Sequence, residues 1–155
     1  MASALPDAPA AAAAHIPIDR LPPFTVVAGY HPMGAELDPG DILRRLSGLG
    51  ATVVLPEVTS PDEALIFRRV DGLGQATPDL VIAPMLAFDR DGGRLGQGGG
   101  HYDRTIERLR ADGSVFVIGL AYAGQEIDAV PNEAHDQRLD AILTDIGYRD
   151  VRKDA

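Results

Sequence analysis

Cysteine is absent from this sequence of 155 residues, and histidine occurs only four times. Without cysteine, the chain cannot form disulfide bonds, use a thiolate nucleophile or build a zinc–thiolate site. The histidines are scattered along the chain and no Ser-His-Asp arrangement stands out, so a His-rich metal site is not expected. These absences exclude several common classes of site and fit a reducing compartment.

Positive charge is also scarce, because 14 lysines and arginines stand against 23 aspartates and glutamates and leave a net charge of −9. Nucleic acids and anionic membrane surfaces repel such an acidic protein, so neither is expected as a partner. A small anionic ligand remains compatible, since a local cluster of backbone N–H groups and arginines can oppose the overall sign. We therefore expect small-molecule partners and a monomer.

Long hydrophobic runs are missing as well, so no segment reaches the length of a membrane span. The first residues, MASALPDAPAAAAA, lack the early basic residue and the strongly apolar middle of a secretory signal. We predict that residues 1–20 form an unstructured Ala/Pro-rich tail and that residues 21–155 form a single α/β domain. The expected location is the cytoplasm.

The remaining sequence alternates between short apolar runs and amphipathic segments. The pattern predicts helices over residues 39–49 and 101–112. It predicts strands over residues 24–30, 51–55, 64–70, 79–84, 115–120, 139–144 and 148–152. Strands that alternate with helices indicate an α/β fold, here a three-layer Rossmann-like domain with a mostly parallel sheet and helices on both faces.

A glycine-rich segment lies between a predicted strand and a predicted helix. Six of the nine residues from Gly92 to Gly100 are glycine, and His-Tyr-Asp-Arg follows at once. The N–H groups and dipole of the helix end suit a phosphate, and Arg94 and Arg104 flank the segment. It matches neither the P-loop nor the dinucleotide fingerprint, because His101 follows Gly100. The segment is thus either a phosphate-binding loop of another kind or a flexible surface turn.

Three carboxylates are candidates for a site. Glu36 follows the first predicted strand, near His31, and is either a solvated loop carboxylate or an acceptor for a ring amine of a substrate. Asp103 can cap the helix that begins near His101 or bind Mg²⁺ beside a phosphate, since a hard cation needs few protein carboxylates there. Asp140 opens the strand over residues 139–144 and is a plausible second carboxylate.

Three segments together resemble the 5-formyltetrahydrofolate cyclo-ligase family, also called methenyltetrahydrofolate synthetase. They are YHPMGAELDPGDILRRL, PDLVIAPMLAFDRDGGRLGQGGGHYDR and GLAYAGQEIDAVPNEAHDQRLDAILTD, and the resemblance covers roughly residues 24–146. It implies an ATP- and Mg²⁺-dependent ring closure, in which ATP phosphorylates the formyl oxygen of 5-formyltetrahydrofolate. N10 then attacks and phosphate leaves, giving 5,10-methenyltetrahydrofolate.

The resemblance also implies roles for individual residues. Arg94 and Tyr102 would be catalytic, and Asp103 and Asp140 would hold Mg²⁺. The residues implied to bind ATP are Arg94, Leu95, Gly96, Gln97, Gly98, Gly99, Gly100, His101 and Tyr102. Those implied to bind the folate are His31, Glu36, Gln97, Gly98, Gly99, Gly100 and His101.

The sequence departs from the family pattern in three places. The family has a longer basic helical region before the first strand, where this chain offers only Arg20. It also has a longer folate-facing stretch where this chain has DGLGQATP, and Tyr or Phe is typical where His101 stands. These departures keep two alternatives open. One is a non-catalytic or truncated relative that binds nucleotide or folate, and the other is an ATP-dependent ligase with another substrate.

Overall fold

The computed structural model describes residues 7–59, 64–96, 100–131 and 137–151 of the chain. Within those residues, a seven-stranded sheet has the strand order β3-β2-β1-β4-β7-β8-β9. Its strands are β1 (Val26–Ala28), β2 (Thr52–Glu57), β3 (Ile66–Arg69), β4 (Leu80–Pro84), β7 (Phe116–Leu120), β8 (Ala141–Thr144) and β9 (Gly147–Asp150). Each predicted strand therefore exists, with ends shifted by a few residues.

Parallel pairing dominates the centre of the sheet. β1 pairs with β2 and β4, and β7 pairs with β4 and β8, all in parallel. The two edge strands β3 and β9 pair antiparallel with β2 and β8. The prediction of an α/β fold with a mostly parallel sheet is confirmed.

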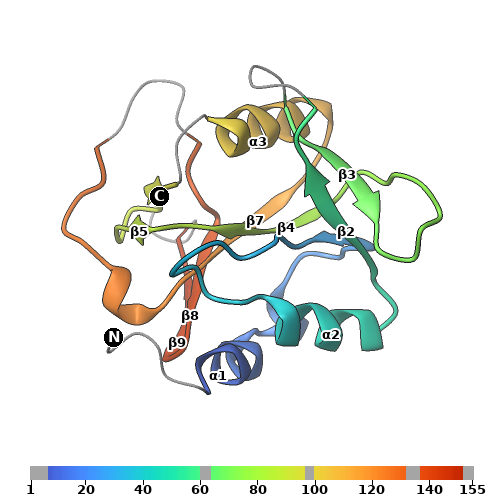
Figure 1. Cartoon of the computed structure of the whole chain (residues 1–155). Coiled ribbons are helices and arrows are strands. Elements are labelled where there is room, and N and C mark those ends of the chain that lie inside the picture. The colour runs from blue at the N-terminus through green and yellow to red at the C-terminus, as the bar shows by residue number, and fades with distance from the viewer. Residues whose placement is uncertain (1–6, 60–63, 97–99, 132–136, 152–155) are drawn as a thin grey trace.

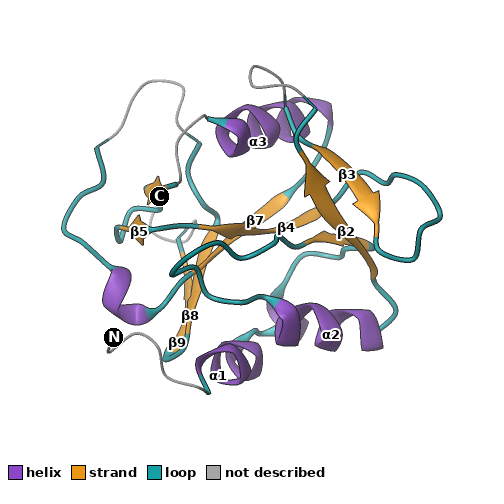
Figure 2. Cartoon of the chain, in the orientation of Figure 1, coloured by secondary structure: helices purple, strands orange, loops and turns teal. Residues whose placement is uncertain are grey.

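Helices cover both faces of the sheet (Figures 1 and 2). Helices α1 (Ala8–His15) and α2 (Gly40–Gly48) lie on one face, and α3 (His101–Asp112) lies on the other. None of the helices in the described ranges combines the length and the apolar character that crossing a bilayer requires. The predicted three-layer arrangement is thus present.

The central strands are buried on both sides, which explains their continuous apolar sequences. In β4, Leu80 and Ile82 belong to the core cluster on the side of α1 and α2, whereas Val81 and Ala83 belong to the cluster on the α3 side. This alternation follows from the two-residue period of a strand. One strand therefore contributes side chains to both layers of core.

Helix α1 corrects the prediction of an unstructured tail over residues 1–20. Ala8 and Ala12, one helical turn apart, are 2% and 0% exposed, and α1 packs against α2 and β8. Alanine has the highest helix propensity, and its small side chain lets a helix approach the sheet closely. Arg20, in the 3-10 turn η1 (Ile18–Arg20), has its guanidinium carbon 5.6 Å from the centre of the Tyr148 ring. The low complexity of this segment is therefore not a sign of disorder between residues 8 and 20.

The strand order places a topological switch point between β1 and β4. The chain leaves β1 through α2 to reach β2 on one side, and leaves β4 through α3 to reach β7 on the other side. In doubly wound sheets, ligands bind outside the carboxyl ends of the two strands at this point. Tyr30 and His31 follow β1 there, and Pro84 ends β4. The fold thus predicts a site at these residues.

Candidate functional site

A pocket of about 370 Å³ opens where the carboxyl ends of β1 and β4 meet the start of α3. It brings together most of the site residues predicted from the sequence. These are His31, Glu36, Arg94, Leu95, Gly96, Gly100, His101, Tyr102 and Asp103. Gln97, Gly98 and Gly99 lie outside the described residues, and Asp140 does not line the pocket.

The turn after β1 holds Glu36 in a buried position. Glu36 is 6% exposed, and its Oε1 accepts a hydrogen bond from the backbone N–H of Met33 at 2.9 Å. The backbone N–H of Glu36 in turn donates to the Met33 carbonyl at 3.1 Å, and Gly34 between them has φ +57°. The turn is therefore closed from both ends. Glu36 is a fixed, buried carboxylate at the pocket rather than a solvated loop residue.

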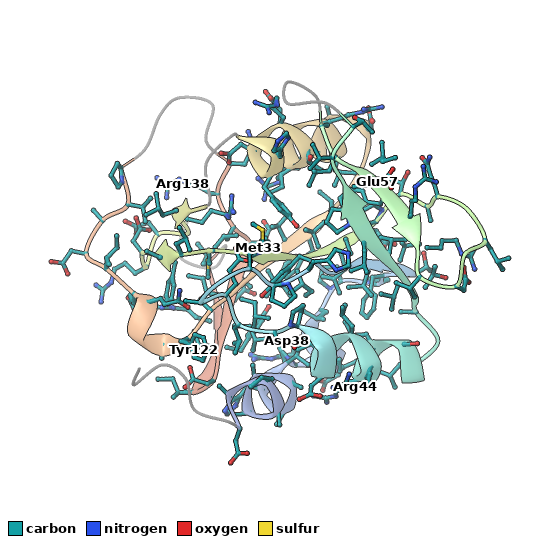
Figure 3. The ribbon with its side chains drawn as sticks, in the orientation of Figure 1. Met33, Asp38, Arg44, Glu57, Tyr122 and Arg138 are labelled. Carbon is teal, nitrogen blue, oxygen red and sulfur yellow. The ribbon has the colours of Figure 1, made fainter. Side chains whose placement is uncertain are left out.

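Tyr30 also stabilises this turn, through its hydroxyl. Its hydroxyl donates a hydrogen bond to the carbonyl of Leu37, directly after Glu36. Burial raises the pKa of Tyr30 above its ordinary value, and the nearby Glu36 carboxylate acts in the same direction. Tyr30 thus remains a neutral donor. Met33, from the same turn, is 55% exposed and lines the pocket (Figure 3).

Arg94 is held by the end of β4. It starts β6 (Arg94–Leu95), which pairs with β5 (Ala87–Phe88) in a small second sheet. Its Nε and Nη2 donate to the carbonyl of Pro84 at 3.3 and 2.7 Å, and its guanidinium carbon lies 5.3 Å from the centre of the Tyr102 ring. Two contacts therefore fix a positive charge at the pocket, which is where a phosphate would need it.

Helix α3 begins at His101, as the sequence predicts. Gly100 is its N-cap with φ +70°, a left-handed conformation that favours glycine. The first backbone N–H groups of α3 and the positive end of its dipole therefore lie at the pocket. Arg104, one turn along, has Nη2 3.5 Å from Nδ1 of His101.

The hydroxyl of Tyr102 is buried. No hydrogen-bond partner for it exists among the residues that the structure describes. Burial raises the pKa of this hydroxyl above its ordinary value, although the charge of Arg94 acts in the opposite direction. A buried donor without a partner is costly, so this hydroxyl is suited to an acceptor on a ligand.

The two carboxylates predicted to share Mg²⁺ are not brought together. Asp103 lines the pocket, and its Oδ1 accepts the backbone N–H of Gln137 at 3.0 Å. Asp140 stands before β8, at the amino edge of the sheet, where Oδ2 accepts the N–H of Val117 at 2.8 Å and Nη2 of Arg110 at 3.2 Å. The described part of the chain contains no group of three or more His, Cys, Asp or Glu side chains placed to hold a metal ion.

The pocket also contains residues that sequence analysis missed. They are Tyr30, Met33, Pro56, Val58, Leu65, Pro84 and Pro131. Tyr30 and Pro84 stand at the carboxyl ends of predicted strands, so the switch-point rule could have found them. Leu65 and Pro131 carry no such signal, because their place depends on how the whole sheet is ordered.

Fold and pocket together define the class of protein: a doubly wound α/β protein with a pocket at its switch point, where ligands bind in such folds. The sequence pattern of the 5-formyltetrahydrofolate cyclo-ligase family matches residues 69–145. The 5-formyltetrahydrofolate cyclo-ligase of Mycolicibacterium smegmatis is 34% identical over 145 residues, which cover 76% of this chain and 72% of that protein. The chain therefore belongs to the 5-formyltetrahydrofolate cyclo-ligase family.

Solved structures agree with this assignment. The 5,10-methenyltetrahydrofolate synthetase of Mycoplasma pneumoniae matches with a TM-score of 0.67 and 29% identity, over 79% of this chain and 74% of that one. The 5,10-methenyltetrahydrofolate synthetase of Aquifex aeolicus matches with a TM-score of 0.70 and 25% identity, over 93% of this chain and 81% of that one. These relatives are enzymes with the same architecture.

Proposed function

We propose that this chain converts 5-formyltetrahydrofolate to 5,10-methenyltetrahydrofolate with ATP and Mg²⁺, releasing ADP and phosphate. The observation that carries the proposal is a single pocket that unites a buried carboxylate, Glu36, with Arg94 and the N-terminus of α3. A family member with this pocket has a place for a ring amine and a place for a phosphate. Its proposed partners are the small molecules ATP and 5-formyltetrahydrofolate.

The phosphate side of the pocket consists of Arg94 and the start of α3. Gly96 and Gly100 present backbone without a Cβ on either side of the undescribed residues 97–99, so phosphates can approach closely. Arg94 supplies a fixed positive charge in a chain whose net charge is −9. Phosphoryl transfer depends chiefly on positioning and charge stabilisation, and these groups provide both.

The folate side of the pocket consists of the turn after β1. Glu36 offers a carboxylate that can accept hydrogen bonds from ring amines, and His31 lines the pocket beside it. The hydroxyl of Tyr102 adds a neutral donor between the two sides. Leu65, Val58 and Met33 supply apolar surface for a flat ring system.

The reaction balances in two steps. The formyl oxygen attacks the γ-phosphorus of ATP, and ADP leaves with the electrons of the broken P–O bond. N10 then attacks the formyl carbon, the C–O bond breaks, inorganic phosphate leaves with the former formyl oxygen, and the proton of N10 is released. Arg94 would stabilise the phosphate charge in both steps, and Glu36 would hold the ring that carries the formyl group.

Asp103 fits a Mg²⁺ ligand, because its carboxylate lines the pocket beside the proposed phosphate site. Mg²⁺ often uses one or two protein carboxylates and completes its coordination with phosphates and water. When bound, Mg²⁺ would neutralise charge on the phosphates. The role of Asp140 as a Mg²⁺ ligand stays a prediction. A direct contact with the ion would require its carboxylate to give up the hydrogen bonds from Arg110 and Val117.

Substitution of the two aspartates separates their roles. We expect Asp103→Asn to raise the Mg²⁺ concentration for half-maximal rate by about tenfold or more, because the amide is a poorer ligand for a hard cation. Asp140→Asn should instead lower the free energy of unfolding by roughly 1–3 kcal/mol, since it breaks a partly buried hydrogen-bond pair. Steady-state rates against Mg²⁺ and urea unfolding measure the two effects. An equal rise in the Mg²⁺ concentration for half-maximal rate in both variants would make Asp140 a ligand.

Gly96 provides a test of the phosphate side of the pocket in which the Arg94 side chain is kept. A Cβ at Gly96 would lie 2.7 Å from Nη2 of Arg94, so Gly96→Ala should displace the guanidinium. We expect kcat/KM for ATP to fall about tenfold while the melting temperature stays near that of the wild type, because the clash involves only the end of a flexible side chain. Gly124→Ala is the control, because a Cβ there meets no atom within 4 Å. Wild-type kinetics in Gly96→Ala would contradict the role of Arg94.

The direct test follows the absorbance of the methenyl product with purified protein, 5-formyltetrahydrofolate, ATP and Mg²⁺. Product that depends on ATP supports the proposal. Folded protein that binds ATP or folate without forming product would instead support the non-catalytic alternative. ADP release with a different acceptor would point to a ligase with another substrate.

A further inference from the structure

We infer that Asp89 is a positioning residue, whose carboxylate joins the two chain segments that form one side of the pocket. It is not among the residues that line the pocket, and it is 3% exposed. The inference rests on the proposed function in that Arg94, which it would position, is assigned to the phosphates.

The first segment that Asp89 holds is its own turn. Its Oδ1 accepts the backbone N–H of Asp91 at 3.0 Å and that of Gly93 at 2.9 Å. The backbone N–H of Asp89 also donates to the Gly93 carbonyl at 3.1 Å, so the turn is closed. Arg94 is the next residue, and its guanidinium lines the pocket. The turn thus fixes the backbone from which Arg94 extends.

The second segment lies 41 residues further along the chain. The other oxygen of Asp89, Oδ2, accepts the backbone N–H of Val130 at 2.8 Å. Val130 is buried, and Pro131, the next residue, lines the pocket. A single carboxylate therefore ties the backbone just before Arg94 to the backbone just before Pro131. The same two segments also meet at Phe88, whose carbonyl accepts the backbone N–H of Ile127 at 2.8 Å, and the carboxylate adds a second link closer to Arg94 and Pro131.

The Asp89 carboxylate packs closely against its own turn. A Cβ built on Gly93 would lie 2.7 Å from Oδ2 and 3.1 Å from Oδ1 of Asp89, so the carboxylate packs directly against the Gly93 backbone. Gly92, with φ +87°, allows the sharp turn beside it. Arg138, labelled in Figure 3, donates from Nη1 to the Asp91 carbonyl at 2.6 Å and adds a further tie to the turn.

Asp89→Asn tests this link between the two segments with almost no change in the shape of the side chain. An amide keeps one acceptor oxygen, which would stay with Asp91 and Gly93, but it turns an N–H₂ group toward the N–H of Val130. We expect the Val130 amide to exchange its hydrogen about tenfold faster or more, and kcat/KM for ATP to fall by a similar factor. Amides of β7, such as that of Ile118, should keep their wild-type exchange rates. Exchange is read by NMR, and the kinetic constants come from the absorbance assay.

Two further variants separate positioning from charge and from general stability. Asp89→Glu keeps the charge but not the fit, so it should not restore the wild-type kcat/KM. Asp79→Asn is the matched control, because Asp79 also accepts backbone N–H groups from a distant segment, Thr25 at 3.0 Å and Val26 at 2.9 Å, but it stands before β4, at the end of the strand opposite the pocket. Its kinetic constants should equal those of the wild type.

The outcomes distinguish this inference from the proposed function. Faster exchange at Val130 with unchanged kcat and KM would make Asp89 purely structural and overturn the inference, as would full activity of Asp89→Glu. An inactive wild type would contradict the proposed function. In that case the hydrogen-exchange rates decide. Unchanged exchange at Val130 in Asp89→Asn would overturn the inference, and faster exchange would support the link that Asp89 makes between the two segments.

Discussion

Replacing Arg94 by methionine should reduce kcat/KM for ATP by about 10²- to 10³-fold, the loss found when a preorganised donor to a developing negative charge is removed. The reason lies in its contacts. Arg94 is anchored to the carbonyl of Pro84 and faces the ring of Tyr102, so it reaches the phosphate site already ordered. Methionine keeps the length and the apolar contacts of the side chain but removes the charge and all five donors.

Arg94→Lys is the informative partner of this variant. Lysine keeps the charge, but it cannot hold the Pro84 carbonyl and a phosphate with the two edges of one planar group, so most of the loss should remain. The exposed Arg68 on β3 provides the control, and Arg68→Met should leave kcat/KM unchanged. The measurement is the rate of methenyl product over a range of ATP concentrations. A drop of less than threefold in Arg94→Met would rule out Arg94 as a phosphate ligand.

Replacing Ala12 by glutamate should lower the free energy of unfolding by about 3 kcal/mol or more, because it places an unpaired charge in the core. Ala12 is 0% exposed in α1 and packs in the core cluster that includes Leu46 of α2. The variant escapes the cost only by detaching α1, which would expose the same apolar surface. For a chain of this size, the melting temperature should fall by roughly 6–12 °C.

The matched control is Ala10→Glu, because Ala10 lies on the exposed side of the same helix. An acid near the start of α1 is slightly favourable to the helix dipole, so this variant should melt within about 2 °C of the wild type. Thermal unfolding followed by circular dichroism at constant protein concentration compares the two variants. If both melt alike, α1 does not contribute to the stability of the folded chain.

The fold could be predicted from the sequence where local and tertiary signals agree. Helix α3 runs from His101 to Asp112 as predicted, because Gly100 and Gly113 mark its ends and Ile106 faces the core. Helix α1 was missed, because an alanine-rich segment carries no periodic contrast between apolar and polar residues. Its burial depends on contacts with α2 and β8, which no local sequence pattern reports.

The site could be predicted where residues follow the carboxyl ends of strands. Glu36 and residues 94–96 and 100–103 lie there, and one pocket unites them. Asp140 begins a parallel strand instead, and the beginnings of β7 and β8 lie at the opposite edge of the sheet. The direction of the strand therefore carried information about Asp140 that residue type alone did not. Leu65 and Pro131 required the complete strand order.

The two antiparallel edge strands also affect how copies of the molecule meet one another. Arginines on these two strands form ion pairs with nearby carboxylates: Arg68 with Glu57, Arg69 with Asp71, and Arg149 with Glu126. The outer edge of β3 is also occupied, because the Arg69 N–H donates to the Gly74 carbonyl and the Ala76 N–H to the Phe67 carbonyl. At β9, another chain that added a strand would have to desolvate the Arg149–Glu126 pair. The borders of the sheet thus protect the folded protein against edge-to-edge polymerisation, so a concentrated solution should not grow fibrils from the native state.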